Sequence, residues 1–358
     1  MSVSFHSLKI TDIRREIDDA VSLRFELPEA LQETFKFHSG QHLTLRTELD
    51  GEDVRRNYSI CTAPHEGELR VAIKRVPGGR FSSWANQTLT AGDRVEVMAP
   101  HGSFTWTFDP ARETTYAGFA AGSGITPVLS LLKSALSTES KSRFVLLYAN
   151  RASNSIMFLE ELAALKNRFM DRLQVFHFLT DEAEDVELFN GRLDIPRTAE
   201  TLRSLINPGH LGAAFVCGPG PMMDAVEASL LASGVPAERI LIERFTVGEM
   251  SEAQAAAARE LEQKAAGRKV QVTLEGRRRQ IAFDADKGSI LENARAAGMP
   301  APYACKAGVC ATCRAKLVSG QVTMKANYGL SAEEVAQGYV LTCQAVPLTD
   351  DVVLDYDA

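Results

Sequence analysis

The sequence predicts a multidomain protein in which an antiparallel β-barrel, an α/β domain with a doubly wound parallel sheet and a small α+β domain follow one another. Three observations support this order. Short alternating strands come first, continuous apolar strands alternating with helical stretches come next, and four of the six cysteines lie in the last segment. The chain has 358 residues, more than one hydrophobic core usually organises, so two or three domains are expected.

Residues 1–108 are expected to form the barrel. Apolar side chains recur there at every second position between turn residues, for example at Leu69, Val71 and Ile73. This alternation is typical of strands that bury one face only.

Residues 109–248 are expected to form the α/β domain. Continuous apolar runs alternate there with helical stretches, as in parallel sheets that are covered on both faces. The predicted strands are Tyr116–Phe119, Phe144–Tyr148, Val175–Leu179, Phe215–Cys217 and Ile240–Ile242.

Residues 249–268 are rich in Ala and Glu and contain no proline, so we expect a helical linker. Residues 269–358 begin with a hairpin-like pair of strands, followed by a helical stretch near Ile290 and a cysteine-rich loop. We expect this last segment to form the α+β domain.

The composition excludes several classes of function. Lys and Arg number 39 against 46 for Asp and Glu, and the net charge of −7 argues against sequence-independent nucleic-acid binding. No apolar run approaches the roughly 18 to 20 residues that cross a bilayer. The N-terminus lacks the features of a signal peptide, so we expect a cytoplasmic protein with reduced thiols. Reduced thiols favour metal binding or catalysis over disulfides.

The clustered cysteines predict a [2Fe–2S] centre. Cys305, Cys310 and Cys313 have the spacing C-x4-C-x2-C, and Cys343 follows downstream, as in plant-type ferredoxins. A loop of small residues around Gly308 lets backbone amides approach the sulfurs. The alternative is a four-thiolate zinc site, but such sites usually pair two C-x2-C knuckles.

Two motifs in the barrel segment suit a flavin nucleotide. Arg56, Tyr58 and Ser59 offer a guanidinium for a diphosphate, an aromatic face for a planar ring and a hydroxyl for a ring nitrogen. The run 78–83, Gly-Gly-Arg-Phe-Ser-Ser, presents backbone N–H groups and hydroxyls that suit a phosphate at a helix start. Taken alone, this run is equally consistent with an ordinary turn.

Two glycine-rich loops follow strands of the α/β segment. The run 122–127, Gly-Ser-Gly-Ile-Thr-Pro, lies where a doubly wound fold binds a diphosphate, although Pro127 stands where the dinucleotide fingerprint has its third glycine. The run 217–222, Cys-Gly-Pro-Gly-Pro-Met, ends a later strand. Two such loops at one sheet edge define a cleft.

The charge after the second parallel strand favours NADPH over NADH. Arg151 stands where NAD-selective folds often carry an acidic residue for the ribose, and Ser155 offers a further hydrogen bond to a 2′-phosphate. The alternative is a solvated surface arginine with no ligand.

Taken together, these motifs resemble the ferredoxin-NADP reductase superfamily with a C-terminal ferredoxin domain. The resemblance covers nearly the whole chain and implies a flavin barrel, a nicotinamide domain and a β-grasp ferredoxin domain. The ferredoxin segment, including the run 322–328, resembles the reductase subunits of multicomponent di-iron oxygenases. The resemblance also implies FAD, since the short motifs do not distinguish FAD from FMN.

The resemblance implies a role for each motif residue. Ser59 near flavin N5 and Cys217 near the nicotinamide would serve catalysis. The expected cofactor-binding residues are Arg56, Tyr58, Ser59, Gly79, Ser82 and Ser83 for FAD, Phe245 for the other flavin face, and Gly122, Gly124, Thr126, Arg151, Ser155 and Gly218 for the nicotinamide dinucleotide. The expected metal ligands are Cys305, Cys310, Cys313 and Cys343.

The implied activity is electron transfer from NADPH through FAD and the [2Fe–2S] cluster to a di-iron oxygenase. Two alternatives remain at this point. One is the same reductase serving a ring-hydroxylating or alkane- or alkene-oxidising oxygenase, and the other is a non-enzymatic zinc-bearing interaction module. Neither nucleic acid nor a membrane is an expected partner.

Overall fold

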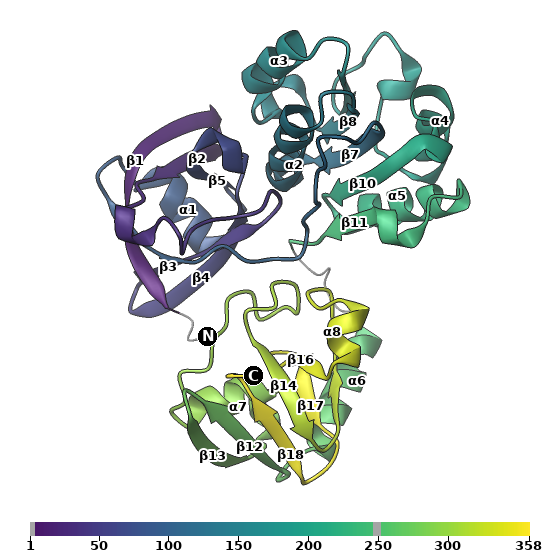
Figure 1. Ribbon diagram of the computed structural model, residues 1–358. Helices are drawn as coiled ribbons and strands as arrows, with labels where there is room; N and C mark the ends of the chain where they lie inside the picture. The colour runs from purple at the N-terminus through teal and green to yellow at the C-terminus, as the bar shows by residue number, and fades with distance from the viewer. Residues whose placement is uncertain (1–3, 246–251) are drawn as a thin grey trace. The chain divides into compact units, whose positions relative to one another are not determined.

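The structure, a computed structural model, describes residues 4–245 and 252–358 (Figure 1). Within these residues the chain separates into two compact units. One unit holds residues 5–54 and 58–245, and the other holds residue 4, residues 55–57 and residues 252–358.

The first part of the larger unit is a six-stranded antiparallel barrel, as predicted. Its strands have the order β4-β3-β6-β1-β2-β5. A bridge between Ile60 and Val71 joins the two ends of this order and closes the barrel. The strands are β1 (Phe5–Ile17), β2 (Ala20–Phe25), β3 (His42–Leu49), β4 (Glu52–Ser59), β5 (Leu69–Lys74) and β6 (Arg94–Met98), and helix α1 (Arg80–Gln87) follows β5.

The turn between β3 and β4 has a clear sequence basis. Asp50 and Gly51 both have positive φ, of 53° and 77°. A two-residue turn of this kind matches the twist of the flanking strands, and Asp-Gly is among the few pairs that adopt it readily. The turn therefore sets where β4 begins, and this strand ends at Ser59.

The second part of the larger unit is a five-stranded parallel sheet with the order β11-β10-β7-β8-β9. Each strand predicted from an apolar run is present, and β7 lies at the centre. The strands are β7 (Thr115–Ala121), β8 (Arg143–Asn150), β9 (Leu173–Leu179), β10 (Leu211–Cys217) and β11 (Ile240–Glu243).

Helices cover both faces of this sheet (Figure 1), which is the doubly wound arrangement. One core contains Leu129 of α2 (Ile125–Thr138) and Leu162 of α3 (Leu159–Arg168). The opposite core contains Leu202 of α4 (Ile195–Leu205) and Val226 of α5 (Gly220–Ala232). Because β8 and β10 lie on opposite sides of β7, the strand order reverses at the loop that follows β7.

The smaller unit is an α+β domain with a mixed five-stranded sheet, in the order β13-β12-β18-β14-β16, and a two-stranded sheet of β15 and β17. Helix α7 packs into its core through Ile290 and Leu291. The elements are β12 (Lys269–Leu274), β13 (Arg277–Ala282), α7 (Ile290–Ala296), β14 (Arg314–Ser319), β15 (Val322–Met324), α8 (Ala332–Ala336), β16 (Tyr339–Leu341), β17 (Ala345–Pro347) and β18 (Val352–Asp355).

The segment predicted as a helical linker contains helix α6 (Glu252–Lys264). The end of this helix is anchored in the smaller unit. Glu262 pairs with Lys325 at 2.5 Å, Leu261 packs against the core, and Ala265 is buried in it. From Leu261 onward the segment is therefore part of the C-terminal unit. The beginning of the predicted linker, residues 249–251, lies outside the described residues.

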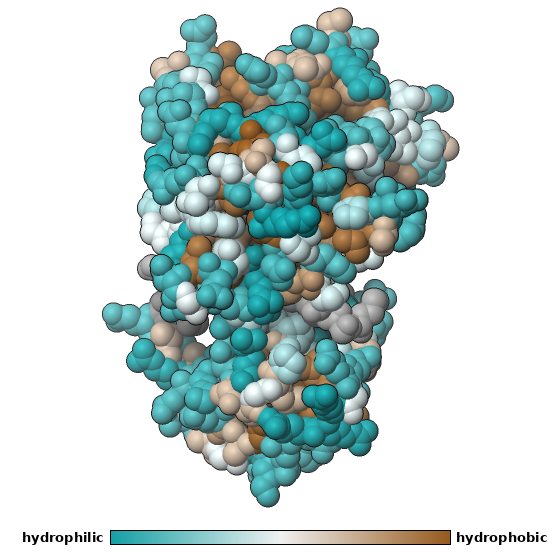
Figure 2. All heavy atoms as spheres, turned by 90° about the vertical axis from the view of Figure 1, so that its left-hand side faces the viewer, coloured by the Kyte–Doolittle hydropathy of each residue, from teal (hydrophilic) through white to brown (hydrophobic). Residues whose placement is uncertain are grey.

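The surface carries no extended apolar band on the face drawn in Figure 2, where hydrophilic side chains predominate and hydrophobic ones form scattered patches. Among the described residues, no helix is long and apolar enough to cross a bilayer.

Candidate functional site

Strand β4 carries the three residues predicted to hold the flavin. The Ser59 hydroxyl is buried and has no hydrogen-bond partner within residues 4–245 and 252–358. Tyr58 is half-buried, with its ring 5.5 Å from that of Phe81, and Arg56 is exposed on the same strand. A buried hydroxyl without a partner is costly unless a ligand satisfies it. Ser59 therefore fits a polar atom of a bound ring.

The start of helix α1 fits a diphosphate. Gly79 precedes the helix, and no side chain caps its first backbone N–H groups. The Ser82 hydroxyl accepts from the Val76 N–H at 3.1 Å and donates to the Gly79 carbonyl at 3.2 Å, while Ser83 is half-buried beside it. A Cβ on Gly79 would lie 2.5 Å from the Ser82 oxygen, so a larger residue there would displace the Ser82 side chain. The open N–H groups form a ready anion site.

The two glycine-rich loops of the parallel sheet meet at one edge. Gly122 has φ of +52°, a conformation that favours glycine. A Cβ on Gly124 would lie 2.1 Å from the Cys217 carbonyl oxygen and 3.0 Å from the Gly218 nitrogen. The structure thus brings Gly122, Gly124, Cys217 and Gly218 together at the strand-order reversal, where doubly wound folds bind ligands.

The predicted site residues Thr126, Cys217 and Phe245 lie near this edge of the sheet and differ in burial and hydrogen bonding. Thr126, in the first turn of α2, donates its hydroxyl hydrogen to the Ser123 carbonyl at 3.0 Å. Cys217 is fully buried, and burial together with the nearby Glu243 raises the pKa of its thiol, which stays protonated. Phe245 follows β11 and is 38% exposed, which leaves its ring available to a planar ligand.

The predicted coenzyme-selecting residues follow β8. Arg151 is exposed, and its carbonyl accepts from the Asp181 N–H at 2.8 Å. The Ser155 hydroxyl donates to the Ala152 carbonyl at 2.6 Å, so its hydrogen is held within its own turn. Arg151 is therefore the better placed of the two to meet an anionic ligand.

The cysteine loop brings the four predicted metal ligands together in two pairs. The thiols of Cys305 and Cys310 hydrogen-bond each other, and those of Cys313 and Cys343 form a second pair. Backbone and side-chain N–H groups approach two sulfurs: Ala307 N lies 3.3 Å from Cys305 Sγ, and a Gln344 amide lies 3.8 Å from Cys343 Sγ. All six cysteines of the chain are free of disulfides.

This pairing suits two metal ions rather than one. A zinc site needs its four ligands around one centre, whereas a binuclear cluster takes two thiolates on each iron. Hydrogen bonding with Cys305, and then with Thr312, lowers the pKa of Cys310 to about 5 despite its burial, so thiolate forms readily there.

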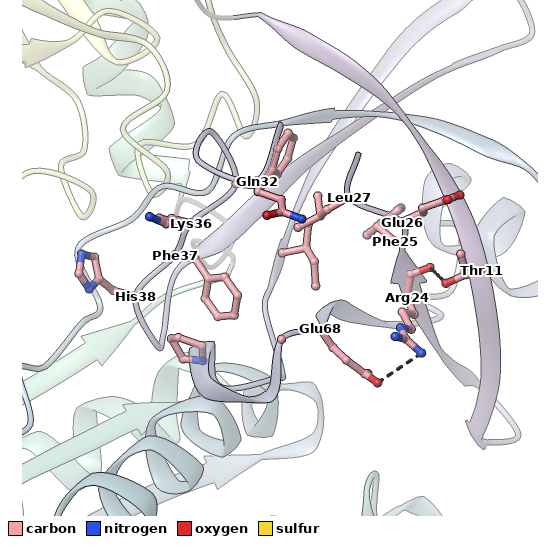
Figure 3. A pocket seen from close by; sticks show the side chains of 14 residues that line it. Thr11, Arg24, Phe25, Glu26, Leu27, Gln32, Lys36, Phe37, His38 and Glu68 are labelled. Atoms are coloured by element: carbon pink, nitrogen blue, oxygen red, sulfur yellow. Dashed lines mark hydrogen bonds and ion pairs between the residues drawn. The ribbon is translucent and has the colours of Figure 1, made fainter. Parts of the chain in front are cut away.

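A large cavity of the barrel lies away from all these motifs. It has a volume of about 1040 Å³ and contains none of the predicted site residues. Figure 3 shows its mixed lining, in which Arg24 pairs with Glu68 at 3.4 Å and accepts a hydrogen bond from Thr11 on its carbonyl. Within the described residues, no buried side-chain polar atom of its lining lacks a hydrogen-bond partner. The size of a cavity alone therefore does not identify the cofactor-binding site.

Three polar residues at the site were not predicted from the sequence. Asn150 ends β8, and both polar atoms of its buried side chain lack a hydrogen-bond partner within the described ranges. His42 and His101 approach each other to 3.0 Å between their Nε2 atoms. The position of Asn150 at the end of a predicted strand could have marked it as a candidate site residue. The two histidines are 59 residues apart and share no local motif, so the sequence did not point to them.

The fold and the site define an oxidoreductase with a flavin domain, a nicotinamide domain and an iron–sulfur domain. Three family models match the chain: an oxidoreductase FAD-binding domain over residues 7–106, an oxidoreductase NAD-binding domain over 119–228 and a 2Fe-2S iron-sulfur cluster binding domain over 272–348. Its cofactors are FAD, a [2Fe–2S] cluster and NAD(P)H. The zinc-bearing interaction module is thereby set aside.

The chain belongs to the family of reductase components of oxygenases. It is 44% identical to a subunit of the 1,2-phenylacetyl-CoA epoxidase of Escherichia coli, over 99% of this chain and 98% of the relative. It is 35% identical to the ferredoxin reductase component of 3-ketosteroid-9-alpha-monooxygenase of Rhodococcus rhodochrous, over 98% and 96% of the two chains.

A solved structure contains the same three kinds of domain in the same order. Phthalate dioxygenase reductase matches 98% of both chains with a TM-score of 0.61 and 24% identity. This similarity confirms the fold: a flavin barrel, a nucleotide-binding parallel sheet and a C-terminal ferredoxin domain.

Proposed function

We propose that this protein is the reductase component of a phenylacetyl-CoA epoxidase, and that it passes electrons from NADPH through FAD and the [2Fe–2S] cluster to a di-iron oxygenase. The observation that carries the proposal is the 44% identity to the Escherichia coli epoxidase component over 99% of the chain. The next relatives, at 35%, serve a ketosteroid monooxygenase, which is the alternative kind of partner.

We propose FAD-binding roles for the residues of the barrel. Tyr58 stacks on the flavin ring, Ser59 hydrogen-bonds near N5, and Arg56 neutralises the diphosphate. The diphosphate also meets the α1 N-terminus at Gly79, Ser82 and Ser83. The buried, partnerless Ser59 hydroxyl and the uncapped helix start support these assignments.

We propose nicotinamide-binding roles for the sheet edge. Gly122, Gly124, Thr126 and Gly218 line the dinucleotide, Cys217 lies by the nicotinamide, and Phe245 covers the flavin face that Tyr58 leaves open. Arg151, assisted by Ser155, pairs with the 2′-phosphate and favours NADPH. The close approach of Gly124 to Cys217 supports a single continuous cleft.

The bound flavin converts a two-electron hydride donor into a one-electron supply. The chain's own residues position the reactants and exclude water. Cys217, fully buried and protonated, supplies a neutral wall beside the nicotinamide. Four thiolates, from Cys305, Cys310, Cys313 and Cys343, hold the cluster. We propose domain boundaries of 1–108, 109–248 and 269–358, with a connecting segment at 249–268 whose end, from Leu261 onward, packs on the C-terminal domain.

The experiment that tests the proposal is reconstitution of the purified holoprotein with two oxygenase components in parallel. One is the phenylacetyl-CoA epoxidase oxygenase with phenylacetyl-CoA, and the other is a 3-ketosteroid 9α-hydroxylating oxygenase with its steroid. We expect NADPH-dependent product only with the first. Product only with the second would contradict the proposed partner while leaving the reductase activity intact.

A further inference from the structure

A chain of hydrogen bonds leads from the end of β18 to the cysteine loop. Tyr356, which directly follows β18, donates its phenol hydrogen to Thr342 Oγ1 at 2.7 Å. Thr342 in turn donates its hydroxyl hydrogen to the Cys313 carbonyl oxygen at 2.9 Å. The chain therefore connects three segments that are far apart in the sequence, and Tyr356 belongs to none of the motifs described above.

Both hydroxyls of this chain are shielded from water. Thr342 is fully buried, and Tyr356 is 9% exposed, with its side chain in the hydrophobic core of the C-terminal domain. Hydrogen bonds in a buried chain strengthen one another, and a buried hydroxyl that loses its partner is costly. The chain therefore fixes the direction in which both hydrogens point, which is toward the Cys313 carbonyl.

The backbone around Thr342 is tied to several elements at once. The Thr342 N–H is a second donor to the Cys313 carbonyl, at 3.2 Å, and the Thr342 carbonyl accepts from the N–H of Leu291 in α7 at 3.0 Å. The N–H of Tyr356 donates to the carbonyl of Thr273 in β12 at 3.0 Å. Thr342 thus holds the Cys313 carbonyl through two hydrogen bonds, and α7 and Tyr356 hold Thr342.

The chain reaches both cysteines of one thiol pair. Thr342 directly precedes Cys343 in the sequence, and the thiols of Cys313 and Cys343 form the second of the two pairs described above. A binuclear cluster takes two thiolates on each iron. The hydrogen bonds of Thr342 therefore fix the backbone at both ligands of the same iron.

The direction of the two O–H dipoles has an electrostatic consequence. Each hydrogen, the positive end of its dipole, points along the chain toward Cys313. Reduction adds one negative charge to the cluster, and hydrogen bonds and solvent exposure around the ligands set the potential of such centres. Dipoles oriented in this way stabilise the more negative, reduced state.

We propose that Tyr356 is a positioning residue of the iron–sulfur centre. Through Thr342 it fixes the backbone of Cys313 and Cys343, and it raises the reduction potential of the cluster that these cysteines hold. The proposal rests on the ligand set proposed above.

The test compares the holoprotein with variants that lose one hydroxyl each. Tyr356→Phe removes the phenol oxygen and keeps the ring, and Thr342→Val removes the other hydroxyl at nearly the same side-chain volume. Thr342→Ser keeps the hydroxyl and is the conservative replacement. Tyr339→Phe is the matched control, because it removes a phenol oxygen from β16, in the same sheet but outside the chain of hydrogen bonds.

Four quantities are measured on each protein: the midpoint potential of the cluster with chemical reductants, the electron paramagnetic resonance spectrum of the reduced cluster, the rate of iron release to a chelator, and the melting temperature. Because chemical reductants supply the electrons, the potential does not depend on the path from NADPH. The measurement therefore separates the role of Tyr356 from the proposed electron path.

We expect Tyr356→Phe and Thr342→Val each to make one-electron reduction about two- to tenfold less favourable, the scale of one hydrogen bond; tenfold corresponds to about 59 mV. The resonance spectrum should change, and iron release should become about tenfold faster, as is typical when a group that orients a metal ligand is lost. Thr342→Ser and Tyr339→Phe should keep the parent values.

A parent-like potential and resonance spectrum in Tyr356→Phe would overturn the proposal, even with a lowered melting temperature, because the hydroxyl would then be a packing contact only. Tyr356→Phe decides the question if Thr342→Val assembles no cluster, since it leaves Thr342 in place. A parent protein with no [2Fe–2S] signal would overturn the ligand set as well.

Discussion

Replacing Gly124 by alanine should open the cleft between the two glycine-rich loops. The new Cβ would lie 2.1 Å from the Cys217 carbonyl oxygen and 2.5 Å from its carbon, both of them backbone atoms that cannot rotate away. The loop after β7 and the end of β10 must therefore separate by roughly 1 Å to reach ordinary contact.

The size of the effect follows from this separation. Overpacking of this kind costs about 1–3 kcal/mol of the free energy of unfolding. A displacement of about 1 Å between a nicotinamide loop and Cys217 costs up to about 10²-fold in the rate of a reaction that depends on alignment. Flavin reduction by NADPH should therefore slow by about 10- to 10²-fold, with a melting temperature lowered by several degrees.

The assay is anaerobic stopped-flow of flavin reduction, together with thermal unfolding of the holoprotein. Gly220→Ala is the matched control, because Gly220 lies in the second glycine-rich loop and a Cβ there would meet no atom within 4 Å. Equal rates and melting temperatures for the parent and both variants would refute the packing argument.

Three other predictions follow from separate features. Cys343→Ser removes one of the four predicted cluster ligands, so it should abolish the iron–sulfur absorption and the electron paramagnetic resonance signal of the cluster. The FAD content and the reduction of FAD by NADPH should persist. Loss of FAD as well would show that the two cofactor sites are not independent. Arg151→Ala should lower kcat/KM for NADPH by about 10- to 10²-fold, since a charge-assisted hydrogen bond contributes about 1.5–3 kcal/mol, and leave kcat/KM for NADH unchanged; an equal loss with both coenzymes would mean that Arg151 does not meet the 2′-phosphate. Lys133→Met should lower the free energy of unfolding in urea by about 1–3 kcal/mol at pH 7, because the Lys133 side chain is 5% exposed and pairs with Glu161 at 2.5 Å and Glu66 at 3.0 Å, whereas the two carboxylates are about one third exposed and stay partly solvated without it. Burial acts to lower the pKa of Lys133, but the two carboxylates outweigh burial, and the pKa of Lys133 lies above its ordinary value. The stabilisation is therefore complete below about pH 10 and is lost as pH rises through the folded-state pKa. A difference in free energy of unfolding between parent and variant that stays constant to about pH 11 would contradict this.

The periodicity of the sequence predicted the barrel and the parallel sheet because each of them has a local signature. Alternation marks the barrel strands, unbroken apolar runs mark the parallel strands, and every predicted run of the α/β segment lies within a strand from β7 to β11. The cysteine spacing likewise predicted a site whose ligands are mostly close in sequence.

Features that depend on tertiary contacts were not predictable in this way. The pairing of His42 with His101 joins residues 59 positions apart, and only the closed barrel brings them together. The anchoring of the end of α6 depends on Lys325, 63 positions away from Glu262, so composition predicted a helical linker but not the contact that fixes its end. Asn150 is a strand-end residue whose importance shows only in its unsatisfied, buried amide.

The most direct test of the electron path is anaerobic stopped-flow of the holoprotein with NADPH, recorded across the flavin and iron–sulfur bands. We predict that flavin absorption bleaches first, that iron–sulfur absorption bleaches after it, and that electron paramagnetic resonance then shows one reduced [2Fe–2S] cluster. Bleaching of the flavin with no change in a fully assembled cluster would contradict the path from NADPH through FAD to the cysteine loop.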